Sequence, residues 1–220
     1  MSSRRALALL VIGVGVGMAA LGNGGAAAEA AGDPEMGREV FTAKQCIRCH
    51  PSDGKQAVGP GLAKLRRPQG EMELAGRLWN HAPAMFATLA HKGFEWPRIS
   101  AREMADLMTY LQADPARDPE PDLFKGQVML LRKGCLKCHS LRREGGQIEP
   151  DLAEPRSDYE SAAAWAAAMW THTPAMAGMA GRQGIQYPRF SGDEMGNLVG
   201  FLRHAATISP PSRSRIAPGR

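Results

Sequence analysis

Apolar side chains follow a helical period near the end of each half of the chain. Residues 100–112 carry them at positions i, i+3, i+4 and i+7, namely Met104, Leu107, Met108 and Leu111. The same spacing returns after position 191, at Met195, Leu198, Val199 and Leu202. Ser100 stands three residues before Glu103, and Ser191 three before Glu194, which is the pattern of a capping box. Both stretches are predicted to be amphipathic helices.

Further helices are predicted in the first half at residues 34–44, 71–79 and 84–92. Pro83 is expected to end one helix and begin the next, because proline suits a first helical turn and breaks a helix interior. The alternation of apolar and polar residues that indicates strands is missing. The predicted fold class is therefore all-α.

The two halves of the chain repeat each other. LWNHAPAM in the first half corresponds to MWTHTPAM in the second, and GFEWPRISAREM corresponds to GIQYPRFSGDEM. Gly37 matches Gly126 and Lys44 matches Lys133, at an offset of 89 residues that grows to 91 in the later segments. A duplication of one helical module is the plain interpretation.

This repeat predicts two tandem domains, at residues 31–113 and 123–208. Between them DPARDPEPD, at 114–122, is rich in proline and charge and reads as a linker. The segment 209–220 lacks apolar periodicity and is predicted to be a disordered tail.

The first thirty residues are expected to form a cleaved signal peptide. Arg4 and Arg5 precede an apolar stretch at 6–21, and small residues follow, with cleavage after Ala28 or Ala30. An uncleaved anchor is the alternative, but the apolar stretch falls short of the ~20 residues that a spanning helix needs. We expect export to the periplasm and no transmembrane segment in the mature chain.

All four cysteines stand in two copies of one five-residue pattern, Cys-x-x-Cys-His. The copies comprise Cys46, Cys49 and His50, and Cys135, Cys138 and His139. This pattern is the attachment signature of c-type haem: the two thiols form thioethers with the vinyl groups, and the histidine lies under the iron. Two haem c groups are therefore predicted, with no disulfide.

Two other uses of these cysteines are alternatives to haem attachment. Zinc could take all four thiolates as ligands, and a thioredoxin-like redox pair also uses Cys-x-x-Cys. Zinc does not explain a histidine in both copies, and the redox interpretation lacks a βαβ pattern. Covalent haem remains the favoured hypothesis.

With these motifs in place, each half resembles a class I cytochrome c domain, and the tandem resembles the dihaem cytochromes of the cytochrome c4 type. The resemblance implies that His50 and His139 are proximal iron ligands. It also implies that the carbonyl groups of Pro60 and Pro150 accept hydrogen bonds from these histidines. Such an acceptor fixes the tautomer and raises the basicity of the ligand.

The sixth ligand departs from the family pattern, in which a methionine lies just before the last helix. Here that segment has no methionine in either half, whereas WNHAPAM and WTHTPAM repeat earlier in the chain. They offer Met85 or His81 in the first half, and Met176 or His172 in the second. We favour methionine, which raises the reduction potential relative to a second histidine; core packing is the alternative role.

Charge limits the expected partners. The chain carries +5, and residues 1–30 contribute a net +1 through Arg4, Arg5 and Glu29, which leaves +4. Two haems with ionised propionates bring this to about +2 when oxidised and about zero when reduced. Nucleic acid is therefore not an expected partner. The expected partner is a redox protein with an acidic docking patch. A membrane-bound oxidase or dehydrogenase is the alternative partner.

Three functions fit this sequence. The leading hypothesis is a periplasmic electron carrier without enzymatic activity, because a six-coordinate iron leaves no position for a substrate. The alternatives are a dihaem oxidoreductase of the peroxidase kind and a haem subunit of a larger dehydrogenase or oxidase complex. The near-symmetry of the halves argues against the oxidoreductase, whose catalytic and transfer haems would differ in their surroundings.

Overall fold

The structure is a computed structural model that describes residues 31–53 and 58–208. The expected signal peptide and the expected disordered tail lie outside the described residues. None of the helices within the described ranges is both long and apolar enough to cross a membrane.

Helices make up most of the described chain, which confirms the all-α fold class. They are α1 (Pro34–Ala43), α2 (Leu62–Leu65), α3 (Glu71–His91), α4 (Ala101–Tyr110), α5 (Leu123–Arg132), α6 (Ala162–Arg182) and α7 (Glu194–Thr207). Four short 3-10 turns are interspersed: η1 (Cys46–Arg48), η2 (Pro115–Arg117), η3 (Cys135–Lys137) and η4 (Ser157–Tyr159).

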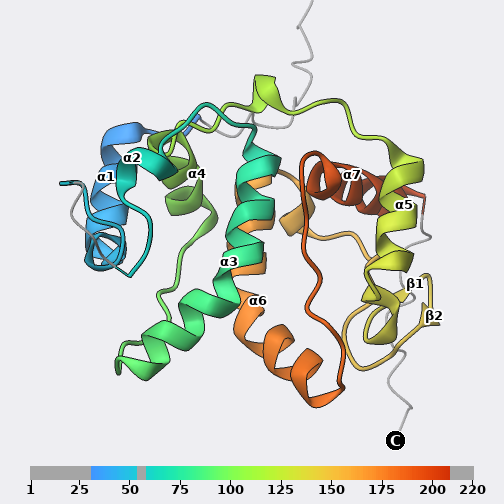
Figure 1. Ribbon diagram of the computed structural model, residues 1–220. Coiled ribbons are helices and arrows are strands. Elements are labelled where there is room, and N and C mark those ends of the chain that lie inside the picture. The colour runs from blue at the N-terminus through green and yellow to red at the C-terminus, as the bar shows by residue number, and fades with distance from the viewer. Residues whose placement is uncertain (1–30, 54–57, 209–220) are drawn as a thin grey trace, which may run out of the picture.

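The two halves pack in the same way around a shared centre. In the first half α1 crosses α4, in the second α5 crosses α7, and the long helices α3 and α6 lie side by side between them (Figure 1). The helix α3 also contacts α7, while α6 contacts α4. Each long helix therefore packs against both the long helix and the last helix of the other half.

Matched glycines allow the close crossings of the first and last helix in each half. A Cβ on Gly37 would lie 2.6 Å from the Cβ of Tyr110 and would also collide with the Asp106 carbonyl. A Cβ on Gly126 would meet Phe201 at 2.6 Å and collide with the Asn197 carbonyl. These contacts leave no room for any side chain at either position.

The ends of these crossings are tied by polar contacts that repeat between the halves. Ser100 and Glu103 form the predicted capping box at the start of α4. The matching prediction at Ser191 was wrong, because α7 begins at Glu194 with Asp193 as its N-cap, although Ser191 still donates to the Glu194 carboxylate. Lys44 lies 2.8 Å from Glu103, and Lys133 lies 2.9 Å from Glu194. Hydrogen bonding to the Lys44 ammonium is the main cause that lowers the pKa of Glu103. The matched lysines therefore tie the chain just before each Cys-x-x-Cys-His segment to the start of the last helix in the same half.

The prediction that Pro83 separates two helices was wrong. The helix α3 continues through Pro83 and α6 continues through Pro174, although both bend part-way along (Figure 1). A proline inside a helix leaves the carbonyl four residues earlier without its N–H donor. For Pro174 that carbonyl belongs to Trp170, and the indole N–H of Trp96 donates to it at 3.0 Å. This tertiary hydrogen bond replaces the lost one.

A small hairpin in the second half was not predicted. Strands β1 (Ser140–Leu141) and β2 (Glu144–Gly145) pair antiparallel across a turn in which Arg142 and Arg143 have positive φ angles. The carboxylate of Asp151 accepts hydrogen bonds from the backbone N–H groups of both turn arginines. Two-residue strands are too short to show alternation, so their sequence gives no signal.

The residues predicted as a linker make ordered contacts. The carboxylate of Asp118 accepts hydrogen bonds from the Met72 N–H at the start of α3, at 3.0 and 3.1 Å. Asp122 caps α5 by accepting from the Lys125 N–H at 3.0 Å. The segment thus fixes where α3 and α5 begin.

Candidate functional site

Each Cys-x-x-Cys-His segment forms one tight turn directly after the first helix of its half. A residue in the left-handed region precedes each turn, Gln45 with φ 62° and Gly134 with φ 75°. The His50 N–H donates to the Cys46 carbonyl at 2.9 Å, and the His139 N–H donates to the Cys135 carbonyl at 3.0 Å. The repeated sequence therefore folds into the same local structure twice.

The two histidines make the same hydrogen bond. Nδ1 of His50 lies 2.9 Å from the Pro60 carbonyl oxygen, and Nδ1 of His139 lies 2.9 Å from the Pro150 carbonyl oxygen. A carbonyl can only accept, so Nδ1 carries the proton and donates. The neutral ring then presents the lone pair of Nε2, which is the form in which histidine binds a metal.

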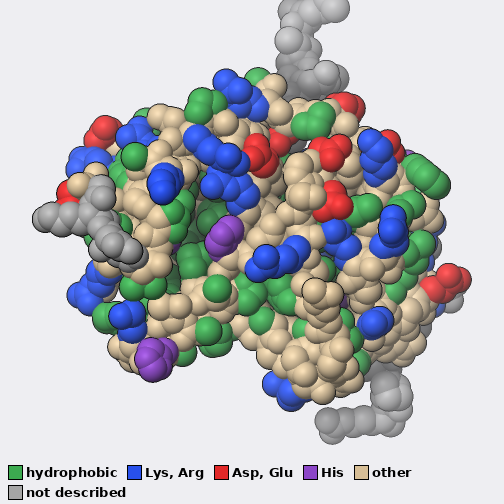
Figure 2. Space-filling view, viewed as in Figure 1, with side chains coloured by type: hydrophobic (Ala, Val, Ile, Leu, Met, Phe, Trp, Pro, Cys, Tyr) green, Lys and Arg blue, Asp and Glu red, His purple; other side chains and the backbone are tan. Residues whose placement is uncertain are grey.

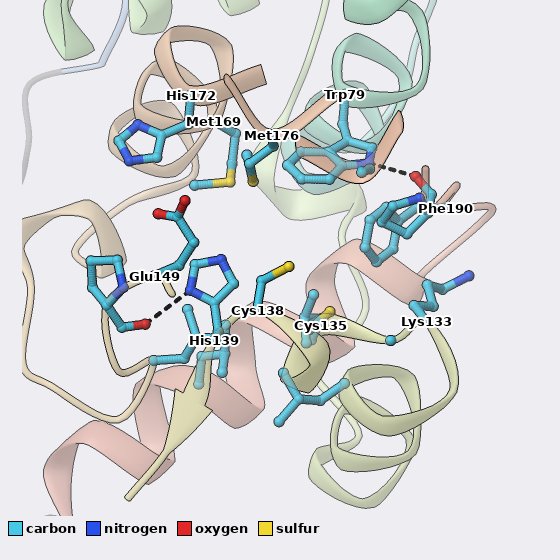
Figure 3. A pocket seen from close by; sticks show the side chains of 18 of the residues that line it. Trp79, Lys133, Cys135, Cys138, His139, Glu149, Met169, His172, Met176 and Phe190 are labelled. Carbon is cyan, nitrogen blue, oxygen red and sulfur yellow. Dashed lines mark hydrogen bonds between the residues drawn. The ribbon is translucent and has the colours of Figure 1, made fainter. Parts of the chain in front are cut away.

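An apolar cavity lies over the second motif. Cys135, Cys138 and His139 form part of its wall, and Met176 of α6 forms another part. Figure 3 shows the sulfur atoms of Met169 and Met176 entering from α6, while His139 enters from the turn that carries the cysteines. Two thiols, an imidazole and thioethers thus face one apolar space from different elements.

The first cysteine of each motif is partly buried. Burial raises the pKa of the Cys46 thiol, and likewise that of the Cys135 thiol, to about 11. Both groups are therefore neutral thiols at physiological pH, not the thiolates of a reactive redox pair. This protonation state argues against the thioredoxin-like alternative.

The structure also bears on the zinc alternative. The two cysteine pairs lie in opposite halves of the molecule, at the ends of α1 and α5 (Figure 1). In the ranges that the structure describes, no three side chains of His, Cys, Asp or Glu gather as a metal cluster. A site that joins all four thiolates is incompatible with this separation.

For the sixth ligand, the histidine and the methionine of each repeated segment are placed differently. The Nδ1 atom of His81 lies 2.8 Å from the Arg77 carbonyl of the preceding helical turn, and the side chain is exposed. Met85 is half-buried against the core. His172 is exposed at the edge of the second cavity, whereas Met176 is half-buried in its wall.

Sequence reasoning missed two further methionines at the second site. Met169 and Met179 line the same cavity as Met176, and they stand seven residues before and three after it. This spacing puts all three on one face of a continuous helix. The signal was present in the sequence, but a helix broken at Pro174 would have hidden it.

The halves differ next to the histidine that ends each Cys-x-x-Cys-His segment. A Cβ on Gly59 would lie 2.7 Å from Nδ1 of His50, so that only glycine fits there without a shift. The matched residue in the second half is Glu149, whose side chain lines the cavity beside His139 (Figure 3). The second site therefore carries an ionisable group that the first site lacks.

Comparisons with known proteins bear on the first half. Residues 34–113 match the family model described as Cytochrome c, and this stretch includes Cys46, Cys49 and His50. A search of curated proteins and a search of solved structures both find no match. A cytochrome c domain carries covalently bound haem c and generally serves as an electron carrier. The match therefore supports a c-type cytochrome, with haem attached through the Cys-x-x-Cys-His segment of residues 34–113.

Proposed function

We propose that the protein is an exported, periplasmic dihaem cytochrome of the c4-like kind that carries single electrons between redox partners. The observation that carries this proposal is the repeated site. In both halves a Cys-x-x-Cys turn is followed by a histidine whose Nδ1 is 2.9 Å from a proline carbonyl. Only the first half matches the family model, but the second half has the same turn and the same hydrogen bond.

The residues of each half fit a haem. In the second half Cys135 and Cys138 would hold the porphyrin through thioethers, and His139 would bind the iron through Nε2. Met176 of α6, which lines the same cavity, would supply a thioether ligand to the iron. In the first half the matched residues are Cys46, Cys49, His50 and Met85. The bound haem supplies a one-electron change of the iron, and no catalytic residue is proposed.

The protein's part in this function is to hold the haem and exclude other chemistry. The carbonyls of Pro60 and Pro150 orient the imidazoles and keep them basic, which stabilises the iron–nitrogen bond. The thioether ligand and the apolar walls favour the less charged ferrous state and raise the potential. With Met85 and Met176 as ligands beside His50 and His139, substrates would find no open position on the iron.

Surface charge supports a protein partner with an acidic docking patch. Lys and Arg side chains stand across the upper middle of one face, with some Asp and Glu among them, beside a hollow whose walls are hydrophobic (Figure 2). The net charge outside residues 1–30 is +4 before any haem is added. Opposite charge on the partner would speed the encounter, and salt would slow it.

A haem subunit of a larger dehydrogenase or oxidase is the second candidate, and one surface favours it. On α5 and just after α7, the side chains of Phe124, Leu131 and Ile208 are 73%, 58% and 55% exposed. The positions on α1 that match Phe124 and Leu131 hold the polar residues Glu35 and Thr42. An exposed apolar surface in only one copy of a duplicated module is typical of an interaction site.

Reaction with carbon monoxide distinguishes a carrier from an oxidoreductase. The reduced holoprotein is expected to bind carbon monoxide sluggishly at both irons, because a protein side chain must first leave the sixth position. Stopped-flow absorbance in the haem bands measures this rate. Rapid binding at one iron, together with peroxide turnover, would contradict the carrier and favour the peroxidase-like alternative.

A further inference from the structure

Trp79 belongs to the first half by sequence, but its ring contacts the second half. Its indole N–H donates to the Pro188 carbonyl at 2.7 Å. The ring stacks on Tyr187 with centroids 5.0 Å apart and planes 20° apart, and it meets Phe190 edge-on at 5.8 Å. With only 8% of its surface exposed, Trp79 is embedded in the segment that precedes α7.

This segment is part of the second haem site. Trp79 lines the same cavity as Cys135, Cys138, His139 and Met176. Figure 3 shows its ring at the side of the cavity, next to the loop that carries Phe190. A side chain from the first half thus closes the site of the second half.

The matched tryptophan makes the reciprocal contacts. The indole N–H of Trp170 donates to the Pro97 carbonyl at 2.8 Å, and Pro97 is the counterpart of Pro188. Its ring stacks on Trp96, the counterpart of Tyr187, with centroids 4.1 Å apart and planes 20° apart. Trp96 also donates to the Trp170 carbonyl at 3.0 Å, which secures the bend of α6 at Pro174.

We propose that the two halves exchange these tryptophans, so that Trp79 completes the haem site of the second half and Trp170 that of the first. This inference rests on the proposed function. A large aromatic ring locked by its N–H excludes water from the cavity wall and holds the loop before the last helix in place. Because water around a haem lowers its potential, the potential of each haem depends on a residue of the other half.

If each haem site were built from one half alone, replacing a tryptophan would change the haem of its own half. The exchange predicts a change at the haem of the other half. In the holoprotein with both haems, Trp79→Phe is expected to lower the potential of the second haem and to speed its reaction with carbon monoxide. Trp170→Phe is expected to do the same to the first haem. Phenylalanine keeps the apolar packing and removes the hydrogen bond, so the variants retain the fold; thermal melts check this.

A redox titration of each variant, followed by visible absorbance, measures these shifts. The two potentials are assigned to their haems with the single-haem variants Cys46→Ser/Cys49→Ser and Cys135→Ser/Cys138→Ser. The exchange alone would be overturned if each variant shifted only the potential of the haem in the tryptophan's own half. It would also be overturned if neither variant changed either potential. Absence of haem from both single-haem variants would overturn the proposed function together with this inference.

Discussion

Replacement of Met85 by alanine is expected to convert the haem of the first half from six-coordinate low spin to five-coordinate high spin. The potential of that haem should fall, because the soft thioether that favours ferrous iron is lost. The conversion should be nearly complete, because the first half has no methionine at the positions of Met169 and Met179 that could replace the lost thioether. Leu78 and Thr88 stand there instead. The visible and paramagnetic resonance spectra measure the spin state, and a redox titration measures the potential.

Two variants control this experiment. His81→Ala is expected to leave the ligation intact, because the His81 imidazole lies against the Arg77 carbonyl on an exposed surface. Met36→Ala removes a methionine that is 46% exposed on α1 and should change nothing. High spin in His81→Ala with a silent Met85→Ala would mean histidine ligation and a low-potential haem. A silent spectrum in both would mean that the repeated segment is structural.

The matched change in the second half is expected to be milder. After Met176→Ala, Met169 still offers a thioether in the same cavity. The second haem should therefore keep a larger low-spin fraction than the first haem keeps after Met85→Ala. Met179 also lines this cavity. Adding both Met169→Ala and Met179→Ala to Met176→Ala should therefore remove the difference between the halves.

A methyl group at Gly37 or Gly126 is expected to give the largest loss of stability. An alanine Cβ would collide with the carbonyl of Asp106 in one half and of Asn197 in the other, both on the backbone of a packed helix. The helices must move apart, and overpacking of this kind costs about 1–3 kcal/mol or more in free energy of unfolding. Thermal melts followed by circular dichroism and haem absorbance measure the loss.

Gly181→Ala is the matched control for these substitutions. It lies near the end of α6, and a Cβ there would meet no atom within 4 Å. Alanine in a helix loses less backbone entropy on folding than glycine, so this variant should be neutral or more stable by up to about 1 kcal/mol. Equal stability of Gly37→Ala and the unaltered protein would contradict the close helix crossing.

The residues that could be predicted from the sequence are those whose partners are near in the chain or repeated. The capping box of Ser100 and Glu103 needs only local spacing, and it is present in α4. The hydrogen bonds of His50 to Pro60 and of His139 to Pro150 both followed from a family resemblance. Local spacing was not sufficient everywhere: Ser191 has the same spacing to Glu194, but α7 begins at Glu194 with Asp193 as its N-cap.

The rest depended on tertiary packing. Pro83 and Pro174 carry a strong local signal for a helix break, but contacts between the halves override it. The Trp170 carbonyl freed by Pro174 receives its hydrogen from Trp96, which is 74 residues away in the chain. No local pattern shows that a tryptophan will cross into the other half, and so the shared construction of the sites was not predicted.

The mass of the exported holoprotein tests the central claim most directly. Intact mass spectrometry of the protein isolated from the periplasm is expected to show the chain beginning after Ala28 or Ala30, with two haem groups added and no free thiol. Cys135→Ser/Cys138→Ser should reduce the addition to one haem. A single haem on the unaltered protein would contradict a second haem site, and tightly bound zinc without haem would contradict the account as a whole.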